Sequence, residues 1–105
     1  MQKEYNTEIQ RLFLEMMLQD AQNFIRVQNI YNAENFDRSL RETAKFISEY
    51  SNKYKTLPTA DQINASTGVE LKPDPAMQEH ADWFIEEFEN FTKRQELERA
   101  ILKAA

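Results

Sequence analysis

The sequence predicts an all-α fold: a small globular bundle of about four short helices, followed by one long C-terminal helix. Three observations predict it. The 105 residues include a single glycine and three prolines, which is too little turn material for a hairpin-rich β fold. Hydrophobic residues make up 41% and charged residues 30%, a balance typical of a globular chain and too apolar for disorder. Apolar residues also recur at helical spacing along most of the chain.

Capping residues and apolar stripes predict the first two helices. Residues 6–18 carry apolar side chains at positions i, i+3, i+4, i+7 and i+8, with Asn6 or Thr7 available as the N-cap. Asp20 is expected to cap a second, short helix. The expected stripe of the first helix is Ile9, Leu12, Phe13, Met16 and Met17, and the expected buried residues of the second are Phe24, Ile25, Val27 and Ile30.

A third helix is expected over about residues 37–54, after a polar segment at 32–35. The sequence Leu57-Pro58-Thr59 is expected to end it, because the residue before a proline is disfavoured in α geometry. The apolar side of this helix is expected to contain Leu40, Ala44, Ile47 and Tyr50 or Ser51, with Phe46 and Tyr54 beside them.

A fourth, short helix is bracketed by its own start and stop signals. Thr59 and Gln62 have the spacing of a capping box, and Gly68 stands where a glycine commonly follows a helix. These signals predict a helix over residues 60–66 or 60–67, with Ile63 as its main buried residue. Residues 69–75 are expected to form a loop.

The long C-terminal helix is expected to start near Asp74, with Pro75 at its first position, and to run to the end of the chain without a stop signal. Residues 74–105 would then span about 45 Å, longer than a domain of this size is wide. We therefore expect a globular subdomain at 1–73 and, at 74–105, a helix cut from a longer protein.

The apolar residues of this long helix are the candidate interface. For its first half, packing within the domain and packing against another chain both fit the helical spacing of the aromatic residues. For its second half, the short preceding helices offer too little surface, which favours a partner helix. The candidate interface residues are Trp83, Phe84, Phe88, Phe91, Leu97, Ile101 and Leu102.

Catalytic, cofactor-binding and metal sites are not expected. The sequence has no glycine-rich phosphate loop, no cysteine and one histidine, His80, without the partners that a zinc or di-iron site needs. Carboxylates at 79–89 are ordinary for the first turns of a helix. The net charge of −5 argues against strong DNA binding. Residues 59–69 nevertheless resemble the start of a helix-turn-helix, so a small DNA-binding or regulatory protein is the alternative.

The order and spacing of these segments resemble the N-terminal domain of DnaB-type replicative DNA helicases, particularly those of T-even-like phages. The resemblance covers almost the whole chain. It includes an amphipathic first helix, a short second helix, a polar turn before Phe36, a Leu-Pro-Thr turn, and a tryptophan-led aromatic helix followed by Lys-Arg-Gln. The segments that carry it are 9–18, 19–24, 33–36, 47–50, 57–59, 83–91 and 93–95.

This resemblance implies a non-catalytic, all-helical module that contributes to a hexamer and to contacts with primase and possibly a helicase loader. Residues 83–105 would be the first arm of a helical hairpin that pairs with a neighbour, giving a dimer and, in the full-length protein, a hexamer. ATP and magnesium would bind only in a C-terminal motor domain. The expected location is the cytoplasm of a phage-infected host, with no membrane partner.

Overall fold

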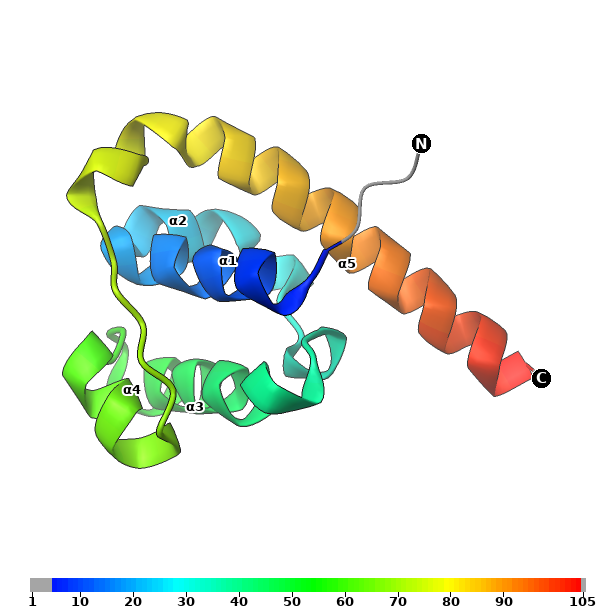
Figure 1. Cartoon of the computed structure of the whole chain (residues 1–105), viewed down its shortest axis with the longest axis horizontal. Coiled ribbons are helices and arrows are strands. Elements are labelled where there is room, and N and C mark those ends of the chain that lie inside the picture. The colour runs from blue at the N-terminus through cyan, green and yellow to red at the C-terminus, as the bar shows by residue number, and fades with distance from the viewer. Residues whose placement is uncertain (1–4, 105) are drawn as a thin grey trace.

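The computed structural model, which describes residues 5–104, arranges the helices in three layers (Figure 1). Helices α1 and α2 form the middle layer, α5 crosses one side of it, and α3 with α4 covers the other. Short 3-10 turns connect α2 to α3 and lead into α5, and the described residues contain no strand. The bounds are α1 Thr7–Gln19, α2 Ala21–Val27, η1 Gln28–Ile30, η2 Ala33–Asn35, α3 Arg38–Tyr54, α4 Ala60–Thr67, η3 Pro75–His80 and α5 Ala81–Ala104.

The helix starts confirm the capping residues that the sequence predicts. The Asn6 side chain accepts a hydrogen bond from the backbone N–H of Ile9, and that of Asp20 accepts one from the N–H of Gln22. Thr59 and Gln62 form the full capping box at α4. At the other end of α4, Gly68 has a φ of 77°, which glycine adopts without the steric cost that other residues meet.

One helix stop signal and one helix start differ from the prediction. Helix α3 ends at Tyr54, as predicted, but it ends there because Lys55 turns into the left-handed region, with a φ of 60°, before the chain reaches Pro58. The stretch from Pro75 to His80 is a 3-10 helix, and the α-helix begins only at Ala81. Asp74 still caps this start, since its side chain accepts a hydrogen bond from the N–H of Ala76.

Two residues differ from the predicted burial. Ile25 was expected inside, but 55% of its surface is exposed. Helix α2 has only seven residues, and Phe24 and Val27 already fill its inner face, so a side chain about 100° further round the helix points outward. Leu71 lies in the predicted loop yet is buried in the core.

Phe13 of α1 is the centre of an aromatic core that includes the first half of α5. Its ring centroid lies 5.9 Å from that of Phe84, 5.6 Å from that of Phe88 and 5.6 Å from that of Phe91. All four rings are fully or almost fully buried. The predicted division between 1–73 and 74–105 therefore cuts through one shared core, and only the second half of α5 is separate from it.

Tyr31 contributes a polar anchor to this core. Its hydroxyl donates a hydrogen bond to the backbone carbonyl of Ala44 in α3, and its ring packs 5.4 Å from that of Phe24 and 5.9 Å from that of Phe36. Burial raises the pKa of the Tyr31 phenol above its ordinary value. The folded protein therefore keeps this proton at a pH where the unfolded chain releases it.

We expect this proton to make the fold sensitive to alkali. The raised pKa contributes stability that is fully present below about pH 10 and is lost above it, by about 1.4 kcal/mol per pH unit. The variant Tyr31→Phe should be less stable than the parent at pH 8 and should lose less stability between pH 8 and pH 11. Thermal melts at both values measure this, with Tyr54→Phe as the exposed control. Equal alkaline losses in the parent and in Tyr31→Phe would contradict it.

Candidate functional site

Helix α5 leaves the body of the protein at Gln95. The Gln95 side chain donates a hydrogen bond of 2.7 Å to the backbone carbonyl of Asn35 in η2. From residue 96 to residue 102 every residue is exposed. At 1.5 Å per residue, the part of α5 beyond Gln95 extends about 13 Å from this contact. Figure 1 shows this end standing clear of the other helices.

The first half of α5 packs within the protein's own core. Phe84, Phe88 and Phe91, three of the candidate interface residues, are buried against α1 and its neighbours. This decides between the two alternatives that the sequence left open for the first half. As interface residues the three phenylalanines are a wrong assignment, because their rings are not on the surface of this chain.

The remaining candidates are exposed, but they do not form the single strip that the sequence suggested. The exposed fractions are 37% for Trp83, 61% for Leu97, 59% for Ile101 and 76% for Leu102. Leu102 follows Phe84 by about five helical turns, so it continues the core-facing side beyond the body. Leu97 follows Phe88 by about two and a half turns and therefore lies on the opposite side.

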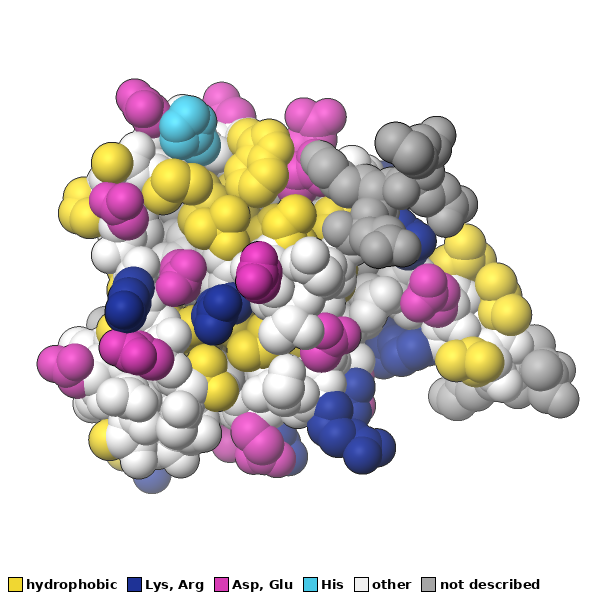
Figure 2. All heavy atoms as spheres, in the orientation of Figure 1, with side chains coloured by type: hydrophobic (Ala, Val, Ile, Leu, Met, Phe, Trp, Pro, Cys, Tyr) yellow, Lys and Arg dark blue, Asp and Glu magenta, His cyan; other side chains and the backbone are white. Residues whose placement is uncertain are grey.

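The outward side of α5 thus has an apolar ridge of its own. Ile101 follows Leu97 by about one turn, and Trp83 precedes Leu97 by about four turns, so all three share that side. We call Leu97 and Ile101 the tip ridge. Figure 2 shows hydrophobic side chains gathered on the projecting end of α5.

Polar contacts hold the first half of α5 against the body. The Tyr5 hydroxyl donates a hydrogen bond of 3.0 Å to the Glu87 carboxylate, and Arg26 of α2 forms an ion pair of 3.2 Å with Asp82. Burial, together with the bond to Glu87, raises the pKa of Tyr5. Where α5 leaves the body, the Nε of Arg94 lies 3.8 Å from the carboxylate of Glu98, which is one helical turn further along.

A second apolar feature, which sequence reasoning missed, is a groove between α3 and α4. It encloses about 430 Å³. Three aromatic residues one turn apart on α3 form its wall, with ring centroids 5.9 Å apart for Phe46 and Tyr50 and 4.6 Å apart for Tyr50 and Tyr54. Gln62, Ala65 and Ser66 of α4 complete it, and the Gln62 amide donates to the Tyr50 hydroxyl. The i, i+4, i+8 aromatic spacing was the available signal.

The described residues contain no group of three histidine, cysteine, aspartate or glutamate side chains placed to hold a metal ion. His80 is half exposed, and its Nε2 lies 3.5 Å from the carboxylate of Glu79. Over residues 5–104, no helix combines the length and the apolar character needed to cross a membrane.

The helix-turn-helix alternative receives no support from the element order. Helix α4 ends at Thr67, and the next α-helix begins only at Ala81, after a loop and the 3-10 helix η3. A recognition helix follows its partner after a turn of three or four residues. The helix that does follow has Asp82 in its first turn, and this negative charge would repel phosphates.

Comparisons of this chain with models of protein families, with curated proteins and with solved structures find no match.

Proposed function

We propose that this chain is a non-catalytic assembly and interaction module, of the kind that forms the N-terminal domain of DnaB-type replicative helicases. In this proposal it brings copies of the protein together, as a dimer here and as a hexamer in the full-length protein. Contacts to primase or to a helicase loader belong to the same proposal. ATP and magnesium would act in a C-terminal motor domain, and the sequence resemblance supports this part of the proposal.

The observation that carries the proposal is the projecting end of α5. Both residues of the tip ridge, and Leu102 on the other side, are exposed on a part of the helix that the body formed by residues 5–95 does not cover. An isolated exposed leucine is ordinary, but three large aliphatic residues within two helical turns are not typical of a solvated helix end. Such a helix end is suited to packing against another chain.

The free energies of burial and association favour weak self-association. Burying one large aliphatic side chain contributes about 1.5–3 kcal/mol. Bringing two molecules together costs an estimated 4–15 kcal/mol, so three such residues leave a small net gain. The net gain is at most about 5 kcal/mol, so we expect weak self-association, with a dissociation constant in the high-micromolar range, rather than a permanent dimer.

Charging the tip ridge should push the protein toward monomer while leaving its fold intact. The double variant Leu97→Glu with Ile101→Lys leaves the net charge unchanged and touches no buried residue. We expect the helical circular dichroism to be retained. The dissociation constant should rise at least about tenfold, because the variant loses the binding energy of roughly one buried side chain. Sedimentation equilibrium over about 10–500 µM total protein measures this dissociation constant.

Lys93→Glu with Glu96→Lys is the matched control, since it places one charge of each sign on exposed positions of the same helix beside the ridge. It should associate much as the parent does. A parent chain that stays monomeric throughout the concentration range would refute self-association by this chain. Tight, salt-dependent binding of an oligonucleotide in fluorescence anisotropy would instead favour the DNA-binding alternative.

A further inference from the structure

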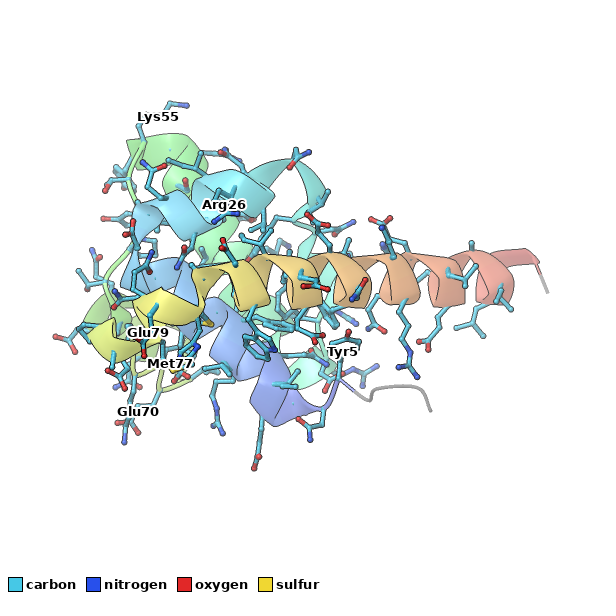
Figure 3. All side chains as sticks on the ribbon, turned by 90° about the horizontal axis from the view of Figure 1, so that it is seen from above. Tyr5, Arg26, Lys55, Glu70, Met77 and Glu79 are labelled. Atoms are coloured by element: carbon cyan, nitrogen blue, oxygen red, sulfur yellow. The ribbon has the colours of Figure 1, made fainter. Side chains whose placement is uncertain are left out.

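The Tyr5 side chain ties the segment before α1 to helix α5. Its hydroxyl donates a hydrogen bond of 3.0 Å to the Glu87 carboxylate, although the two residues are 82 positions apart in the sequence. Its ring lies edge-on to that of Phe91, with the ring centroids 5.6 Å apart. Glu87 and Phe91 are about one helical turn apart, so the two contacts reach the same side of α5. Figure 3 shows the Tyr5 side chain directed toward the middle of this helix.

Tyr5 is itself held in place by hydrogen bonds to other elements. The Gln10 side chain donates one of 2.8 Å to the Tyr5 backbone carbonyl, and its oxygen accepts another of 2.8 Å from the backbone N–H of Asp37. The Thr7 hydroxyl donates a bond of 2.6 Å to the Asp37 carboxylate. These bonds fix residues 5–7 against the start of α3. A side chain that reaches α5 from such a fixed base can resist movement of the helix.

The position of this contact along α5 bears on the projecting end. Tyr5 meets the helix within about two turns of Gln95, where the helix leaves the body. The ion pair between Arg26 and Asp82 ties the start of the same helix to α2. Figure 3 shows Arg26 on the opposite side of α5 from Tyr5. The two ties therefore act on different parts of the helix, and the Tyr5 contact is the one near the exit.

We infer that Tyr5 is a positioning residue, which fixes the direction in which the projecting end of α5 leaves the body. Phe84, Phe88 and Phe91 resist separation of the helix from the core, because separation would expose three buried rings. A sideways tilt exposes far less apolar surface, so contacts on the flanks of the helix limit it. Glu87 lies about 100° from Phe88 around the helix axis, which places the Tyr5 contact on such a flank.

A small tilt of α5 has a large effect on the tip ridge. The middle of the ridge is about 16 Å along the helix from Phe88, so a tilt of about 10° would move it by about 3 Å. A gap of about 1 Å already costs packed atoms a quarter to a half of their attraction. The consequence for assembly rests on the proposed function, because only a tip ridge that packs against a second copy needs a fixed direction.

Distances between spin labels test the direction of the helix in the monomer. The sequence contains no cysteine, so two introduced cysteines carry the only labels. One label replaces Arg99 on the projecting end, and the other replaces Asn52 on α3 or Gln22 on α2, all of which are exposed. The two label pairs observe the tip from different directions. We expect a narrow distance distribution in the parent, and one that is broader or displaced by about 3 Å in Tyr5→Ala, well below the concentration at which copies associate.

Two further variants make this test specific. Arg26→Ala is the matched control, since it removes a tie at the start of α5 and should leave both distance distributions as they are in the parent. Tyr5→Phe keeps the ring and removes only the hydroxyl, so it should cause a smaller broadening of the same kind. Circular dichroism and thermal melts establish that each variant is folded.

Association gives a second readout. If the freed helix presents the tip ridge in the competent direction about one-third of the time, both copies of a pair do so about one-tenth of the time. The dissociation constant of Tyr5→Ala should then rise about tenfold. Arg26→Ala should associate as the parent does. Sedimentation equilibrium measures both.

The outcomes separate this inference from the proposed function. A folded Tyr5→Ala variant with the distance distributions of the parent would overturn the positioning role, and so would an Arg26→Ala variant that broadens them equally. If Tyr5→Ala does not fold, unchanged distances in Tyr5→Phe would overturn it. A parent that stays monomeric would overturn the proposed function, whereas the label distances would still decide the role of Tyr5.

Discussion

Replacing Phe88 by alanine is expected to lower the free energy of unfolding by about 3–5 kcal/mol, a large part of the stability of a domain this small. Phe88 is almost completely buried, and its ring packs edge-on against that of Phe13 at 5.6 Å. It also lies 6.2 Å from the ring of Phe36 and 5.9 Å from that of Phe91. Truncation would remove these contacts and leave a cavity that the surrounding helices can close only in part.

Urea unfolding followed by circular dichroism measures this effect, at a protein concentration low enough to keep the chain monomeric. Trp83→Ala is the control, because it removes a larger ring from the same helix at a position that is more than one-third exposed. The control should cost clearly less than Phe88→Ala. Similar losses for the two variants would show that the first half of α5 is not anchored in the core through Phe88.

The contrast between Phe88 and Leu97 shows how α5 divides into two parts. The sequence predicts the helix and its apolar residues well, because aromatic residues at i and i+4 are recognisable without coordinates. It does not predict where the body ends beside the helix. That point is set by the contact between Gln95 and Asn35, which depends on how η2 packs in three dimensions. Once this point is known, Leu97 and Ile101 can be distinguished from the residues of α5 that face the core.

Local signals explain most of what was predicted correctly. The caps at Asn6, Asp20 and Thr59 and the glycine at position 68 act within four residues of themselves, and all four are confirmed. Features that depend on how the elements pack against one another were not predicted correctly. Lys55 takes a left-handed conformation with no glycine to announce it, and Ile25 is exposed because its neighbours on a short helix already fill the available interior.

The groove between α3 and α4 illustrates the same limit. The sequence predicts Tyr50 or Ser51 on the apolar side of α3, with Phe46 and Tyr54 beside it, but α4 covers only part of this region. Helix α4 packs against α3 but leaves Phe46 and Tyr50 partly exposed and Tyr54 more than half exposed. A helical pattern identifies a side that is suited to burial, and the packing of other elements decides how much of it is buried.

Gln10 is a residue whose role the sequence does not indicate at all. It lies near the start of α1, next to the apolar stripe, and it is buried almost completely. Its amide Nε2 donates a hydrogen bond of 2.8 Å to the backbone carbonyl of Tyr5. Its Oε1 accepts one of 2.8 Å from the backbone N–H of Asp37, at the start of α3. One side chain thus joins three separate parts of the chain.

Replacing Gln10 by leucine is expected to destabilise the protein by about 2–4 kcal/mol, although leucine is apolar and similar in size. The substitution removes both hydrogen bonds and leaves the Tyr5 carbonyl and the Asp37 N–H without the partner they have in the folded state. Each partly buried group that loses its partner costs about 1–3 kcal/mol. Ordinary reasoning from hydrophobicity predicts the opposite sign, because it treats a buried leucine as an improvement on a buried glutamine.

Urea unfolding again measures the free energy of unfolding. The matched control is Gln22→Leu on the exposed side of α2, which should change this stability by no more than about 0.5 kcal/mol. Hydrogen exchange adds a local test: the Asp37 amide should exchange faster in Gln10→Leu than in the parent, by more than the global loss of stability accounts for. A neutral or stabilising Gln10→Leu substitution, with unchanged exchange at Asp37, would mean that the hydrophobic gain outweighs the two lost hydrogen bonds. In that case the start of α3 would be held by its apolar contacts and by its other hydrogen bonds, such as the one that the Thr7 hydroxyl donates to the Asp37 carboxylate.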